Sequence, residues 1–266
     1  AAKTDANIKG IFINPTTVGT GFATLKAIRD ALVDFKKSDK FIVSYSDGYS
    51  QKAYYLASVA DKIYLNPQGS LDFRGLSSST MFMKDALDKL GVDMQVIKVG
   101  TYKSAVEPFM LNSMSEANRL QVNSYLNSIY EAFLDDLSAG RKISKDSLRQ
   151  YVDAYAIRNA DDALKYKFID AKLYKDELIT DIKKRLNIKE KDDISIVSIT
   201  KYGGKNADSK GTDEIAVLYA YGDIVDGEGD VGQIGGDKIS RELRKLRQDD
   251  KVKAVVLRVN SGGGSA

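Results

Sequence analysis

The 266-residue chain contains no histidine and no cysteine. Without histidine, a Ser-His-Asp triad and any histidine metal site are impossible within this chain. Without cysteine there are no disulfides, thiol nucleophiles or cysteine metal sites, although this absence does not distinguish a cytoplasmic from a periplasmic protein. A hydrolase built from this chain would therefore take lysine or a carboxylate as its base.

The sequence also lacks long apolar runs and an excess of either charge. No run approaches the ~20 apolar residues that span a bilayer, and the first residues, Ala-Ala-Lys-Thr-Asp, do not resemble a signal peptide. Because the chain begins almost at once on a strand-like stretch, we expect it to be a piece of a longer protein. Its 40 basic and 37 acidic residues are too balanced to favour nucleic acid as a partner.

Short apolar strands alternate with helical patterns in the first 65 residues. Strands are predicted at residues 8–14, 41–45 and 62–65, and helices at 21–37 and 49–60. This alternation is typical of a parallel sheet whose strands are joined by right-handed crossovers. The sequence therefore predicts an α/β fold.

The stretch 99–109, Val-Gly-Thr-Tyr-Lys-Ser-Ala-Val-Glu-Pro-Phe, lies between a predicted strand at 94–99 and a helix start near Ser115. Its Lys103 has small and apolar neighbours. Burial would lower the pKa of such a lysine and leave a neutral amine that can accept a proton. The alternative is a lysine whose stem covers apolar surface while its ammonium group stays in water.

Residues 100–109 resemble the lysine motif of signal peptide peptidase A, a membrane-bound bacterial serine protease with a Ser-Lys dyad. The resemblance implies that Lys103 is the general base and that no cofactor or metal is needed. It implies cleaved signal peptides as substrates and assembly as a homo-oligomer. It also implies a membrane anchor upstream of this chain, with the catalytic part on the periplasmic or extracytoplasmic side of the bacterial inner membrane.

The middle of the chain is predicted to be helical, and a Gly-, Lys- and Asp-rich linker follows it. The predicted helices cover residues 79–90, 115–137, 144–154, 160–166 and 174–186. We expect four parts: a first α/β copy at 1–110, a helical arm at 111–200, a linker at 201–213 and a second α/β copy at 214–266, cut short.

The second copy is inferred from an internal repeat. Residues 5–13 match residues 249–257 without a gap, at an offset of 244 residues. Two buried strands can also match by composition alone. The duplicated type of signal peptide peptidase A is built in this way, so the resemblance implies tandem crotonase/Clp protease-like domains with mostly parallel sheets.

The last residues, Val259–Ser265, resemble a family motif, Val-Asn-Ser-Pro-Gly-Gly-Ser, with Gly262 in place of the proline. Because glycine lets backbone N–H groups approach a reacting carbonyl, Gly263 and Gly264 are candidates for an oxyanion hole. The alternative is a flexible glycine tail or an expression linker.

The family's nucleophilic serine is not expected within this chain. In the first copy Gln51 falls where the second copy would have its serine, which the repeat places near position 295, beyond this chain. Other hydroxyls are available but do not match that position: Ser44, Ser46, Ser50 and Ser104. We therefore expect the isolated 266-residue chain to be inactive.

Two other functions remain open from the residues. Crotonase-like enzymes share the inferred fold and bind acyl-CoA thioesters, but their chemistry usually relies on glutamates rather than on a lysine base. A non-catalytic scaffold, in which the duplicated fold and the helical arm serve assembly, is the third possibility.

Overall fold

The computed structural model describes residues 1–15, 17–203 and 212–265. It forms two compact units, Ala1–Ser195 and Ile196–Ala266, and each is considered by itself. The predicted linker at 201–213 lies mostly outside the described residues. The four-part division of the chain stays a prediction.

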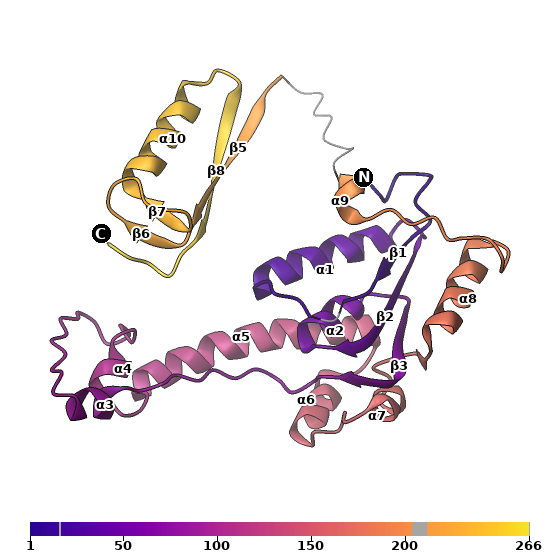
Figure 1. Cartoon of the computed structure of the whole chain (residues 1–266), viewed down its shortest axis with the longest axis horizontal. Coiled ribbons are helices and arrows are strands. Elements are labelled where there is room, and N and C mark those ends of the chain that lie inside the picture. Colours follow the sequence, from indigo (N-terminus) through magenta and orange to yellow (C-terminus); the bar gives the residue numbers. More distant parts are fainter. Residues whose placement is uncertain (16, 204–211, 266) are drawn as a thin grey trace. The chain divides into compact units, whose positions relative to one another are not determined.

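The first unit contains a four-stranded parallel sheet in the order β1-β2-β3-β4 (Figure 1). Its strands are β1 (Gly10–Ile13), β2 (Phe41–Tyr49), β3 (Lys62–Leu71) and β4 (Ala171–Lys172). The crossover helices α1 (Phe22–Lys36) and α2 (Gln51–Ala57) join the first three strands. The predicted α/β fold with parallel strands is therefore confirmed.

Helices cover both faces of this sheet because its strands bury side chains on both sides. Ile42 and Ile63 face the core shared with α1 and α2, whereas Val43 and Tyr64 face Leu178 on the other side. Leu178 belongs to α8 (Lys175–Leu186), which Figure 1 shows on the opposite side of the sheet from α1. The sheet is thus the middle layer of three.

Helices dominate the rest of this unit, as the sequence predicted. They are α3 (Lys84–Lys89), α4 (Glu107–Met110), α5 (Glu116–Arg141), α6 (Lys145–Asp153) and α7 (Ala160–Lys165). Ser115 begins α5 as its N-cap, since its side chain accepts a hydrogen bond from the Asn118 backbone N–H. None of the helices among the described residues is both long and apolar enough to cross a membrane.

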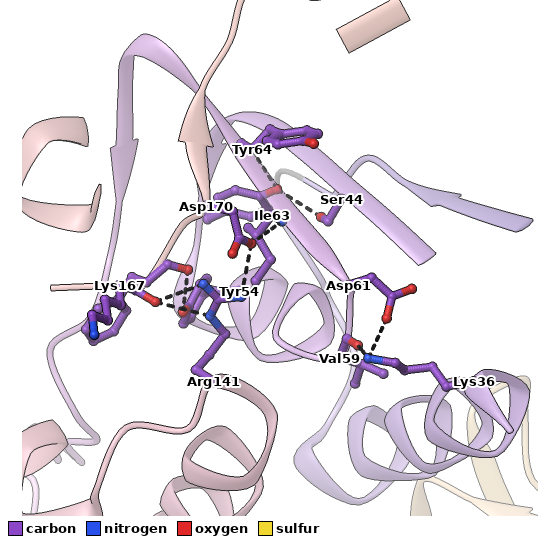
Figure 2. Close-up of polar contacts among 12 residues, drawn as sticks. Lys36, Ser44, Tyr54, Val59, Asp61, Ile63, Tyr64, Arg141, Lys167 and Asp170 are labelled. Atoms are coloured by element: carbon purple, nitrogen blue, oxygen red, sulfur yellow. Dashed lines mark hydrogen bonds and ion pairs between the residues drawn. The ribbon is translucent and has the colours of Figure 1, made fainter. Parts of the chain in front are cut away.

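The helix α5 is fixed to the core through its C-terminal half. Phe133, Leu134 and Leu137 are buried there, whereas Leu120 and Tyr125 in the first half are exposed. The end of the helix is also tied to the sheet through polar contacts (Figure 2).

In Figure 2, the Arg141 guanidinium donates to the Lys167 carbonyl and to the Asp170 carboxylate, at 2.9 and 3.1 Å. The same carboxylate accepts the Ile63 backbone N–H of β3 at 2.8 Å. The C-terminal end of α5 is therefore linked to β3 through the Asp170 carboxylate.

The prediction of a strand at residues 94–99 is wrong. Residues 92–99 belong to no helix or strand, and Ile97 and Val99 are 99% and 86% exposed. No backbone hydrogen bond joins residues 93–99 to any other described residue. The segment has the apolar composition of a strand, but no described strand pairs with it.

The second unit repeats the strand–helix–strand pattern on a smaller scale. The strands β5 (Glu214–Tyr221) and β8 (Val252–Asn260) pair in parallel, as do β6 (Asp223–Val225) and β7 (Gln233–Gly235). The helix α10 (Gly236–Gln248) connects β7 to β8, and α9 (Ile199–Gly203) lies ahead of β5 in the chain. The helix α10 lies in the crossover connection between the parallel strands β5 and β8.

Candidate active site

Lys103 lies in a loop that we call the lysine loop, residues 100–106, between the unpaired segment 93–99 and α4. Gly100 opens the loop with a φ of 103°, which strains any residue with a side chain. The Lys103 N–H reaches the Gly100 carbonyl at 3.4 Å, and the Ser104 N–H donates to the Tyr102 carbonyl at 3.1 Å. These contacts turn the chain sharply at Lys103.

The Lys103 side chain is exposed, and its ammonium group has no hydrogen bond or ion pair with any described residue. No described residue of this unit therefore removes the amine from water. The structure contains the exposed form of the lysine that the sequence left as an alternative to burial.

Glu107 is the buried polar residue closest in sequence to Lys103. It is 1% exposed, and its carboxylate accepts hydrogen bonds from the Ser115 hydroxyl at 2.6 Å, the Asn118 side-chain amide at 2.8 Å and the Ser115 N–H at 3.2 Å. The hydrogen bond from the Ser115 hydroxyl is the main cause that lowers the pKa of Glu107. The carboxylate thus binds the first turn of α5.

Glu107 belongs to the motif identified from the sequence, but the sequence predicted no structural or catalytic role for it. Its partners lie eight and eleven residues further along the chain, beyond the reach of a local pattern. The sequence signal for this role was the pair Ser115 and Asn118 at a helix start. Their N–H and hydroxyl groups can donate hydrogen bonds to a nearby carboxylate.

The candidate oxyanion residues lie in the second unit, at the end of β8. Gly263 and Gly264 have φ values of 112° and 152°. The Gly263 carbonyl accepts the Ile224 N–H of β6, and the Ile224 carbonyl accepts the Ser265 N–H, each at 2.9 Å. The glycine-rich end is therefore paired with a strand.

The two glycine amides differ in their partners. The Gly263 N–H donates to the Ser261 hydroxyl at 3.0 Å, whereas the Gly264 N–H has no partner among the described residues. Lys103 belongs to the first unit and these glycines to the second, so no distance between them is defined.

Three of the four serines considered from the sequence, Ser44, Ser46 and Ser50, have structural hydrogen-bond partners. Ser44 is buried and shares a hydrogen bond with the Tyr49 hydroxyl at 2.9 Å, and buried Ser46 donates to the Gly48 carbonyl at 2.8 Å. Ser50 is the N-cap of α2 and accepts the Ala53 N–H at 3.3 Å. None of these hydroxyls has a lysine as a hydrogen-bond partner.

Gln51 also has a structural role. Its side-chain oxygen accepts the N–H groups of Arg74 and Gly75 at 2.9 and 3.0 Å, and its amide donates to the Gly75 carbonyl at 2.9 Å. The side chain at the position where the repeat would place a serine therefore fastens a neighbouring loop to α2.

Comparison with known proteins gives consistent matches. Residues 13–189 match the profile of peptidase family S49. The chain is 36% identical to Protease 4 of Haemophilus influenzae, covering 100% of this chain and 45% of that protein. It is 38% identical to Protease 4 of Salmonella typhi, covering 99% and 44%.

A plant protein matches as well. The chloroplastic serine protease SPPA of Arabidopsis thaliana is 30% identical over 98% of this chain and 40% of its own length. The chain therefore spans less than half the length of each of these relatives.

Proposed function

Because the chain belongs to peptidase family S49, we propose that it supplies the general-base lysine of a serine endopeptidase with a Ser-Lys dyad. The resemblance to signal peptide peptidase A is confirmed by its relatives. The observation that carries the proposal is the ten-residue motif, which presents Lys103 at a sharp turn without a hydrogen bond or ion pair to any described residue.

In the proposed reaction the neutral Lys103 amine removes the proton from a serine hydroxyl as the serine oxygen attacks the peptide carbonyl carbon. The Gly264 backbone N–H, which has no partner among the described residues, is the candidate donor that stabilises the negative carbonyl oxygen, whereas the Gly263 N–H already donates to the Ser261 hydroxyl. The lysine then gives its proton to the leaving amine, and an acyl-enzyme remains. Water hydrolyses this ester, with Lys103 again accepting a proton, and the serine is restored.

We place the nucleophile outside these 266 residues. Ser44, Ser46 and Ser50 are engaged in the fold, and Ser104 adjoins the base. The repeat offset predicts a serine near position 295 of the longer protein. The isolated chain should therefore hydrolyse no peptide, and Lys103-dependent hydrolysis by it would contradict this placement.

The proposed substrates are cleaved signal peptides, which are apolar and extended. A base that is exposed in a single chain needs an additional surface to exclude water, which agrees with a homo-oligomer. We further propose a membrane anchor upstream of this chain and a catalytic part on the extracytoplasmic side of the bacterial inner membrane.

The test is Lys103→Met in the full-length protein, measured with a fluorogenic apolar peptide. Loss of a general base should lower kcat by about 10²- to 10⁴-fold. Lys89→Met is the matched control, because Lys89 is also exposed and lies outside the lysine loop. Activity of Lys103→Met within about twofold of the unmodified protein would refute the proposal.

The same variant helps to distinguish the proposed protease from the two alternatives, an acyl-CoA enzyme and a non-catalytic scaffold. Protection of the protein by coenzyme A, with no effect of Lys103→Met, would favour an acyl-CoA enzyme. Unchanged assembly of a protein without hydrolytic activity would favour a scaffold.

A further inference from the structure

Glu107 is a buried carboxylate in a part of the chain that is otherwise mostly exposed. Burying a charge is costly unless hydrogen bonds and nearby positive potential offset the loss of water. Here all three bonds come from Ser115 and Asn118, and the first turn of α5 adds the positive end of the helix dipole. The carboxylate therefore joins two chain segments.

One of those segments carries Lys103. The Glu107 N–H donates to the Ser104 carbonyl at 3.0 Å, which closes the turn directly after the lysine. The following residue, Pro108, accepts the Met83 N–H at 2.8 Å through its carbonyl. Glu107 thus bonds to the turn of the lysine loop through its backbone N–H and to the first turn of α5 through its carboxylate.

The other segment, α5, connects this point to the sheet. At 26 residues the helix is about 39 Å long, and its far end is fixed by Leu137 in the core and by Arg141 on Asp170. A rigid helix transmits the position of its fixed end to its free end. The lysine loop acquires a defined position only if it is fastened to that free end.

We propose that Glu107 is a positioning residue for Lys103: its carboxylate fastens the lysine loop to the N-terminus of α5 and so fixes where the base meets the serine. This inference rests on the proposed Ser-Lys function. Glu107 accepts no proton in the reaction and touches no reacting atom. Its loss should therefore misplace the base without removing it.

The first experiment uses Glu107→Gln in the full-length protein, with kcat and KM measured on the same peptide. Glutamine replaces one of the two acceptor oxygens with an NH2 donor, so it cannot accept all three hydrogen bonds that Ser115 and Asn118 donate to Glu107. We expect kcat to fall about 10- to 100-fold with KM within about twofold, because small displacements of a reacting group cost rate more than binding.

The double variant Glu107→Gln/Asn118→Asp reverses donor and acceptor between these two side chains. An acidic residue at position 118 also suits the first turn of a helix. Recovery of at least tenfold in kcat is expected, because the contact is restored while the charge moves to the other segment. A kcat of Glu107→Gln within twofold of the unmodified protein, or no recovery in the double variant, would overturn the inference.

A matched pair of cap variants decides the question if Glu107→Gln folds poorly by circular dichroism. Ser115→Ala and Ser144→Ala each remove an N-cap serine, from α5 and α6 respectively, but only Ser115 bonds to Glu107. We expect kcat to fall at least fivefold in Ser115→Ala and to stay within twofold in Ser144→Ala. Equal effects would overturn the inference.

Lys103→Met distinguishes this inference from the proposed function. If that variant stays active, the Ser-Lys function itself fails. If it is inactive while Glu107→Gln and Ser115→Ala keep full kcat, only the positioning role fails.

Discussion

The substitution Leu137→Ala tests whether α5 is held to the sheet through its C-terminal half. Leu137 is 0% exposed in the core, whereas Leu120, in the first half of the same helix, is 62% exposed. Truncating a fully buried leucine costs about 2–5 kcal/mol, because apolar contact is lost and a cavity remains. The same substitution at Leu120 should change the free energy of unfolding by about 0.5 kcal/mol or less.

The two positions form a matched pair. Both lie inside one helix, so the difference in helix propensity between leucine and alanine is common to both variants and cancels. What remains is the difference in burial.

The assay is urea unfolding of the 266-residue chain, followed by circular dichroism and by the fluorescence of its 15 tyrosines, since tryptophan is absent. With a slope of about 2 kcal/mol per molar urea, the midpoint of Leu137→Ala should fall by about 1–2.5 M, and that of Leu120→Ala by about 0.25 M or less. Equal shifts in the two variants would refute the half-docked arrangement of α5.

Two further predictions concern the lysine loop and the glycine-rich end. Because the folded state lowers the pKa of Glu107, its stabilising contribution is present above the ordinary glutamate pKa and is lost as pH falls through the lower folded value. Protection of the amides in the first turn of α5 against hydrogen exchange, measured by NMR relative to the intrinsic rate at each pH, should therefore fall on acidification below about pH 4.5 more than it does in Glu107→Gln. Gly264→Ala should lower the thermal stability of the second unit, because a Cβ there lies 2.1 Å from the Ile224 carbonyl oxygen, whereas Gly262→Ala should leave it unchanged, since a Cβ there meets nothing within 4 Å.

The sheet of the first unit could be predicted from the sequence because its apolar strands alternate with helices along the chain. That pattern placed β1, α1 and α2 within a few residues of their observed bounds. It missed β4, which has only two residues, and it ended β2 too early, since Ser46 to Tyr49 read as a turn but continue the strand. Short pairings depend on neighbouring strands rather than on local composition.

The error at 94–99 has a different cause. Alternating apolar residues show that a segment is suited to a sheet, but they do not say which edge it pairs with. Here neither edge strand of the first unit's sheet, β1 or β4, pairs with the segment, so it stays unpaired and exposed. The apolar composition of residues 94–99 was interpreted correctly, but composition could not predict which strand would pair with them.

The candidate site was accessible from sequence only in part. Lys103 was identified by resemblance, because an exposed lysine in a turn has no distinguishing local pattern. The role of Glu107 depends on contacts with Ser115 and Asn118, and that of Gln51 on a loop more than twenty residues away. Such contacts follow from the path of the whole chain.

The exposure of Lys103 and the unpaired segment before it have one explanation under the proposed function. A lysine acts as a base only when it is neutral, and surrounding water favours the ammonium form. The backbone of residues 93–99 also lacks partners, and Ile97 and Val99 leave apolar surface in water. A single covering element that pairs with this segment would bury both the apolar side chains and the neighbouring amine. Under the proposed function, proteolysis would then require assembly.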